Sequence, residues 1–180
     1  MTAIRILREE HRVILKALGV LEATADRLTA GERVPDALWA ALLDWLRTFA
    51  DIRHHAKEEE LLFPAMLRAG VPREGGPVAV MLEEHDRGRA LVADMADGEP
   101  SYRARQAWEY ARLQRDHITK EDLALFPLAE AVLDAGQAEI LRRAFDRADH
   151  DDDGPTWSIG AAEVVLDGLA AALGARVAVH

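Results

Sequence analysis

The sequence predicts an all-α protein: an antiparallel up-and-down four-helix bundle followed by a short C-terminal helical extension. Apolar residues recur at spacings of three and four in four long runs, and no stretch shows the strict alternation of a β-strand. A chain of 180 residues fits one compact unit. We therefore expect the bundle over residues 1–135 and the extension over residues 136–180.

The first two helices follow from apolar spacing and from the residues that bound each run. Apolar residues from 4 to 21 share one helical face, between a predicted N-cap at Thr2 and a stop at Gly31. Pro35 occupies a position that the first turn of a helix tolerates, and a second periodic run continues from there towards Gly70.

The next two helices are separated from the first pair by a loop rich in proline and glycine at residues 71–77. A third run begins at Val78 and ends near Gly98. A fourth covers residues 101–134 and is predicted to stop at Gly136.

Two prolines interrupt these runs. Pro64 and Pro127 each remove a backbone donor and are expected to kink or end the second and fourth helices locally. After the fourth run, residues 138–148 predict a short amphipathic helix, residues 149–155 an acidic loop, and residues 158–173 a last helix rich in Ala and Leu.

Charge and composition narrow the classes of partner. The 22 Lys and Arg residues against 32 Asp and Glu give a net charge of −10, which disfavours nucleic acid and anionic membrane surfaces as partners. With no cysteine, any metal must be held by nitrogen and oxygen. The charged first residues indicate neither a signal peptide nor a transmembrane span, so we expect a cytoplasmic monomer or homodimer.

An internal repeat is the most informative feature of the sequence. Residues 54–64 and residues 117–127 share His, Lys, Glu, Leu, Phe and Pro at the same offsets. A Glu-His pair that ends at His11 recurs at His85, one helix earlier in each half. The chain therefore consists of two related helical hairpins, whose equivalent side chains are expected to face one another.

The repeated histidines and glutamates are predicted to face the core. Residues four apart on an α-helix lie about 40° apart around its axis, so each His-x-x-x-Glu pair shares a face with the apolar residues of its helix. The histidines of the first and third helices interrupt apolar stripes. The six residues expected to converge are His11, His54, Glu58, His85, His117 and Glu121.

Two buried carboxylates distinguish a metal site from a set of ordinary core histidines. A single inward histidine is more often a hydrogen-bonded core residue than a ligand. Burying two uncompensated glutamates, however, costs on the order of several kcal/mol for each. Lys57 and Lys120 precede the glutamates by one residue and so point about 100° away. A pair of divalent cations would compensate the charge. Mixed imidazole and carboxylate donors fit iron, manganese or zinc rather than magnesium or calcium.

Residues next to the six predicted ligands are expected to have roles other than binding metal. His55 lies about 100° around the helix from His54, so it is expected behind the ligands or on the surface. Glu10, Glu59 and Glu84 are expected on a solvated acidic face, where one of them could orient a ligand histidine. Tyr110 is expected in the core.

The sequence resembles the hemerythrin-like family of HHE cation-binding domains. The resemblance rests on the Glu-His pairs at His11 and His85 and on the two motifs at residues 54–64 and 117–127, and it spans residues 1–134. It implies a four-helix bundle around two iron ions joined by an oxo or hydroxo bridge. It also implies that the six inward residues are the ligands, with Glu58 and Glu121 as bridges.

The resemblance implies a protein that binds or senses a small molecule such as oxygen, nitric oxide or peroxide. One alternative is an oxidoreductase that reduces these molecules or repairs iron centres. Another is a metal-stabilised scaffold in which zinc would serve as well as iron. Arg89 stands where oxygen-carrying members of the family place a second histidine on the third helix.

Overall fold

The computed structural model describes residues 2–148 and 158–174, and all regular structure in these ranges is helical. The expected acidic loop at 149–155 lies outside them. The elements in chain order are α1 (Ala3–Thr29), α2 (Asp36–Trp45), η1 (Leu46–His55), η2 (Glu58–Leu62), α3 (Phe63–Arg68), α4 (Pro77–Asp94), α5 (Pro100–Lys120), η3 (Glu121–Leu125), α6 (Phe126–Val132), α7 (Ala135–Ala148) and α8 (Ile159–Leu173). The prediction of an all-helical chain is confirmed.

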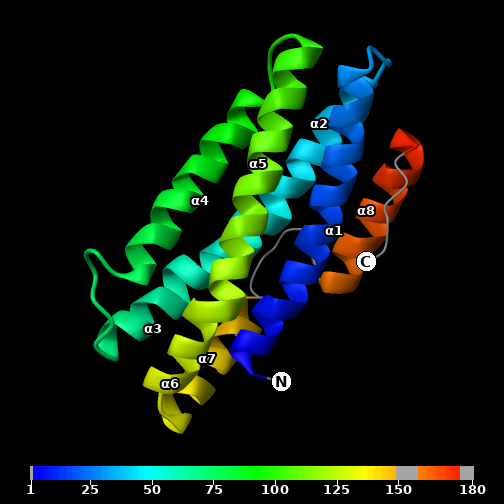
Figure 1. Ribbon diagram of the computed structural model, residues 1–180. Helices are drawn as coiled ribbons and strands as arrows, with labels where there is room; N and C mark the ends of the chain where they lie inside the picture. The colour runs from blue at the N-terminus through cyan, green and yellow to red at the C-terminus, as the bar shows by residue number, and fades with distance from the viewer. Residues whose placement is uncertain (1, 149–157, 175–180) are drawn as a thin grey trace.

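The long helices pack around a common core (Figure 1). Helix α1 lies along α5, α5 lies along α4, and η1 contacts both α1 and α4. Helix α8 packs against α1 and α2, and α7 contacts α1 and η2. Each of the four long segments therefore presents one face to the same interior.

The buried apolar residues form two clusters along the helices rather than one continuous core. On α1, Leu7 belongs to one cluster and Val13 to the other. On α4, Met81 and Leu91 are divided in the same way. The gap between the clusters on each helix is occupied by a buried histidine, so a polar layer crosses the apolar interior.

Two π-helical segments, η2 and η3, lie within the repeated motif, and a third, η1, ends at its first two residues. The backbone N–H of Phe63 donates to the carbonyl of Glu58, and that of Phe126 donates to Glu121, in the wide i to i−5 register. Pro64 and Pro127 lie two residues after η2 and η3, in the first turns of α3 and α6. The chain therefore stays helical through both prolines, with a π register in the turn before each.

Most predicted helix boundaries agree with the structure. The hydroxyl of Thr2 accepts a hydrogen bond from the backbone N–H of Arg5 (3.2 Å), and Gly31 takes a positive φ just after α1. Ser158 caps α8 in the same way as Thr2 caps α1, through the N–H of Ala161.

The predicted end of the fourth helix was wrong. The helix ends at Val132, and Gly136 lies in the first turn of α7. The cause is a reciprocal cap: the Asp134 carboxylate accepts from the N–H of Gln137 (2.8 Å), and the Gln137 side chain accepts from the N–H of Asp134 (2.9 Å). This Asp-x-x-Gln cap begins α7 three residues earlier than the predicted Ala138.

A buried tryptophan connects α8 to the helices beneath it. The indole N–H of Trp45 donates to the carbonyl of Ala162 (3.0 Å). Trp45→Phe should lower the free energy of unfolding by about 1–2 kcal/mol, because it removes this hydrogen bond and leaves a void. Trp108→Phe, at a half-exposed tryptophan of α5, should change it by less than about 0.5 kcal/mol. Urea denaturation followed by circular dichroism measures both, and equal effects would contradict this role of Trp45.

Candidate metal centre

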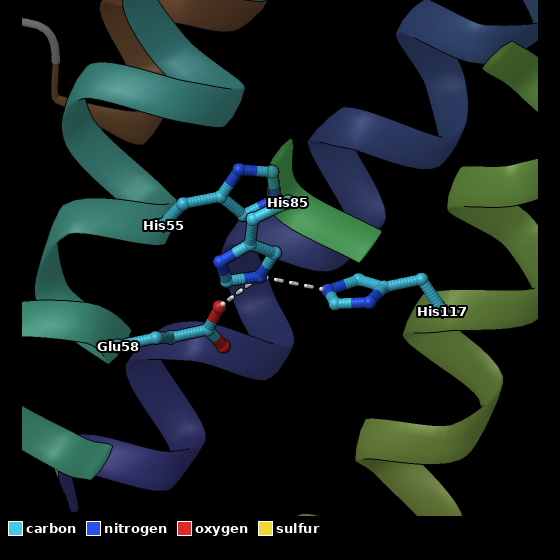
Figure 2. Close-up of side chains that lie close together, drawn as sticks. All are labelled: His55, Glu58, His85 and His117. Atoms are coloured by element: carbon cyan, nitrogen blue, oxygen red, sulfur yellow. Dashed lines mark hydrogen bonds and ion pairs between the residues drawn. The ribbon is translucent and has the colours of Figure 1, made fainter. Parts of the chain in front are cut away.

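The structure brings all six predicted site residues together, and each of them is buried. With His55 they form two overlapping groups whose nearest nitrogen and oxygen atoms lie within 4.8 Å of one another. The first quartet is His11, His54, Glu58 and Glu121, and the second quartet is His55, Glu58, His85 and His117. Figure 2 shows the second quartet, whose residues come from η1, η2, α4 and α5 and lie close together.

The two glutamates lie between the histidines of the two quartets. One oxygen of Glu58 is 3.6 Å from His54 Nε2, and its other oxygen is 3.5 Å from His85 Nε2. Glu121 Oε2 is 3.2 Å from His11 Nε2 and 3.3 Å from His117 Nε2. Each carboxylate can therefore reach both halves of the site, which is the geometry that a bridging ligand requires.

The histidines form two pairs related by the internal repeat. The rings of His11 and His54 lie 4.7 Å apart at 62°, and those of His85 and His117 lie 4.8 Å apart at 62°. The Nε2 atoms of the second pair are 3.1 Å apart. Two nitrogens at about 2.1 Å from one metal and at right angles would be separated by about 3.0 Å, so the spacing suits a shared ion.

A carboxylate faces the outer nitrogen of each of these four histidines. His54 Nδ1 donates to Glu10 (3.0 Å), His117 Nδ1 to Glu84 (2.9 Å), His85 Nδ1 to Glu59 (2.7 Å) and His11 Nδ1 to Asp122 (3.1 Å). Because a carboxylate accepts, the proton sits on Nδ1 and each Nε2 presents its lone pair to the centre. The tautomers are thus set for binding a cation.

The expectation of a solvated acidic face was therefore wrong for three glutamates. Glu10 is buried and forms an ion pair with Lys57, which is buried as well. Glu84 is only partly exposed and pairs with Lys120 in the equivalent place of the second half. Glu59 is held by His85 and Arg89. The two lysines do point away from the metal-facing side, and there they fix the carboxylates that orient the histidines.

The repeated Leu-Phe-Pro sequence also contributes to the site. Phe126 stacks on His11 with ring centroids 5.3 Å apart, and Phe63 stacks on His85 at 5.9 Å. Each phenylalanine covers the histidine of the opposite half of the chain. The rings exclude water from one face of these imidazoles.

The electrostatics of the centre show where positive charge is needed. Burial, together with the nearby Glu121 and Glu10, raises the pKa of Glu58 well above its ordinary value. Burial also lowers the pKa of His54 well below its ordinary value. For His11, the nearby carboxylates of Asp122 and Glu121 outweigh the effect of burial and raise the pKa to about 9. The neighbouring histidines His117 and His11 outweigh burial at Glu121 and lower its pKa, so Glu58 is the carboxylate whose charge is poorly compensated.

The atoms that point into the centre lack partners among the described residues. They are the Nε2 atoms of His11 and His54 and all four carboxylate oxygens of Glu58 and Glu121. Buried polar atoms without hydrogen bonds are rare in folded proteins and are expensive. Six such atoms at one point fit a site for metal ions, with nitrogen and oxygen donors of the kind that iron, manganese and zinc accept.

His55 differs from the sequence expectation in one respect. It is buried rather than at the surface. Its ring stacks on His85 with centroids 3.9 Å apart and only 15° between the planes. Because the two rings lie in nearly parallel planes, one ion cannot lie in the plane of both, and this stacking favours His55 as a neighbour of the ligands.

The family follows from this geometry and from sequence comparison. Residues 2–129 match the family described as the hemerythrin HHE cation binding domain, so the chain belongs to that family. It is also similar to two uncharacterized proteins, Mb2018 of Mycobacterium bovis and Rv1995 of Mycobacterium tuberculosis. Each is 26% identical over 160 residues, which cover 83% of this chain and 62% of the relative. The chain thus spans about three fifths of the length of these relatives. Within the described residues, no helix combines the length and apolar character needed to cross a membrane.

The carboxylates behind the histidines can be tested one at a time. Glu84→Gln replaces a charged acceptor of His117 Nδ1 with a weaker neutral one and should lower the affinity for metal about tenfold. Glu83→Gln, at the exposed neighbouring residue of α4, is the matched control and should leave the affinity unchanged. Competition with a chromophoric chelator measures both. Equal affinities for the two variants would show that Glu84 does not act through His117.

Proposed function

We propose that this protein binds two iron ions through His11, His54, Glu58, His85, His117 and Glu121. We further propose that the ion pair, joined by an oxo or hydroxo bridge, binds or senses a small molecule such as oxygen, nitric oxide or peroxide. The observation that carries the proposal is the convergence of buried, unpartnered nitrogen and oxygen atoms from four helical segments on one point. The chain's membership of a cation-binding family supports it.

Charge balance favours two ions over one. Two divalent cations bring four positive charges to the two carboxylates, whereas the flanking lysines are already paired with Glu10 and Glu84. Six side chains shared between two ions also leave coordination positions unfilled by protein. When bound, a redox-active metal pair with open positions supplies the ability to bind a small ligand and exchange electrons with it.

The residues of the chain have three further tasks in this proposal. Glu58 and Glu121 bridge the two halves, because each lies within 3.6 Å of a histidine nitrogen from both pairs. The four Nδ1 contacts hold the imidazoles in the tautomer that binds a cation. The apolar clusters above and below exclude bulk water and admit only a small molecule.

We also propose that α1, the α2–α3 segment, α4 and the α5–α6 segment form the antiparallel four-helix bundle of this family over residues 1–135. The closed set of contacts among α1, α5, α4 and η1 supports this arrangement. Residues 136–180 would then be an extension, of which α7 and α8 pack against the outside of the bundle.

Removal of a ligand should lower metal content and stability together. Glu58→Ala and His117→Ala should each lose at least one metal ion per chain, and the Tm measured after metal loading should fall by about 5 °C or more. Glu58→Gln keeps the shape of the side chain and should show the same loss. His55→Ile, which copies Ile118 of the second half, is the control and should keep both ions. Elemental analysis and calorimetry measure these outcomes, and full metal content in Glu58→Gln would count against the site.

The response to small molecules distinguishes the proposed function from its alternatives. Protein purified without oxygen should contain two iron ions per chain, and its absorption spectrum should change reversibly on addition of oxygen or nitric oxide. Continued consumption of peroxide or oxygen in the presence of a reductant would instead indicate an oxidoreductase. A zinc-loaded protein of equal stability, together with an iron-loaded protein indifferent to all three molecules, would indicate a scaffold.

A further inference from the structure

A cavity of about 200 Å³ lies between η1, α4 and α5, beside the metal centre. Its wall includes His55, Gly88, Tyr110 and Gln114. Gly88 is three residues after His85, and Gln114 is three residues before His117, so the cavity lies about one helical turn from two of the proposed ligands. It has room for several water-sized molecules.

Two polar side chains face this cavity without protein partners. Tyr110 and Gln114 are each only 2% exposed, and neither hydroxyl nor amide hydrogen-bonds to any residue in the described ranges. Burial raises the pKa of Tyr110, so its hydroxyl keeps its proton and can donate. Because both residues line the cavity, their polar groups are available to a molecule held in it.

His55 connects the cavity to the metal centre. It lines the cavity, and its ring stacks on His85 with centroids 3.9 Å apart. Figure 2 shows the His55 ring beside that of His85, close to His117 and Glu58. A molecule in the cavity can therefore contact a residue that touches a proposed ligand.

The charged residues at the cavity leave no unpaired positive charge for an anion. Arg47 and Arg89 line it, but Arg89 contacts Asp51 (2.9 Å), Asp86 (3.0 Å) and Glu59, and Arg47 lies 3.9 Å from Asp44. Because both guanidinium groups are paired with carboxylates, they attract a negative ligand only weakly. An uncharged ligand does not depend on such attraction.

We propose that this cavity is a holding site for a small, uncharged, hydrogen-bonding molecule of the hydrogen peroxide class, bound by Tyr110 and Gln114 on its way to the metal pair. The binding itself depends only on the cavity. Its role as a route to the metal rests on the proposed function, and the two are tested by separate measurements.

The first experiment measures binding without redox chemistry. Zinc-loaded protein is titrated with hydrogen peroxide to about 100 mM, because a ligand of two heavy atoms binds no tighter than the millimolar range. The side-chain amide resonance of Gln114, assigned with Gln114→Leu, should shift to saturation. Gly88→Leu should abolish the shift, since even a Cβ at this position would lie 2.9 Å from Gln114 Nε2. No shift in the wild-type protein, or an equal shift in Gly88→Leu, overturns the holding site.

The second experiment follows the reaction of iron-loaded protein by stopped-flow absorbance. Gly88→Leu should slow the reactions with hydrogen peroxide and with nitric oxide at least about tenfold, because it fills the route. Gly168→Leu in α8, where a Cβ meets nothing within 4 Å, is the matched control and should react like the wild type.

The double variant Tyr110→Phe, Gln114→Leu distinguishes the effect of hydrogen bonding in the cavity from the effect of blocking the cavity. It should slow the peroxide reaction about tenfold, the value of one good hydrogen bond, and change the nitric oxide reaction less than about twofold. Unchanged peroxide rates in this variant and in Gly88→Leu, with wild-type metal content, overturn the route. If iron-loaded wild-type protein reacts with neither probe, the proposed function fails while a saturable Gln114 shift still supports the holding site.

Discussion

Two glutamates without accessible surface, Glu58 and Glu121, impose the constraint on which this structure depends. Their four oxygens find no hydrogen-bond donor among the described residues, and burial raises the pKa of Glu58 well above its ordinary value. The free energy lost by burying these groups must be recovered elsewhere, and the apolar clusters on both sides cannot supply a counter-charge. The surrounding histidines turn their Nε2 atoms inward, so cations in the proposed site would supply the missing counter-charge. We therefore expect folding and metal binding to be coupled.

At the metal centre, residues from each half of the repeat contact histidines of the other half. Asp122 of the second half orients His11 of the first, and Glu59 of the first half orients His85 of the second. The phenylalanines follow the same rule, since Phe126 covers His11 and Phe63 covers His85. Neither hairpin alone can orient its own first histidine. This exchange explains why the motif continues past the glutamate to Phe, whose ring covers a histidine of the opposite half.

The helical spacing of the sequence was sufficient to predict the all-helical fold and to find the six side chains that converge. It failed where burial depends on packing between helices. His54 and His55 are both buried in η1, although 100° per residue separates their directions on an ideal α-helix, because helices pack on more than one side of this segment. The burial of Glu10 could not be predicted from local spacing, because its partners, His54 and Lys57, come from a different helix. The start of α7 depends on the Asp-x-x-Gln cap at Asp134 and Gln137, whereas the prediction used only Gly136 as a stop.

The repeat is nearly symmetric in its metal-facing residues and asymmetric in what surrounds them. The residue that corresponds to Gly88 in the first half is Ile14, which is buried. His55 corresponds to Ile118, which is buried as well. Two buried isoleucines therefore stand in the equivalent positions of Gly88 and His55, which line the cavity. A duplicated helical hairpin can supply two equivalent sets of ligands, but a small molecule needs only one path to them. We infer that the replacement of Ile by Gly in one half sets the direction of approach, while the symmetric residues continue to bind the ions.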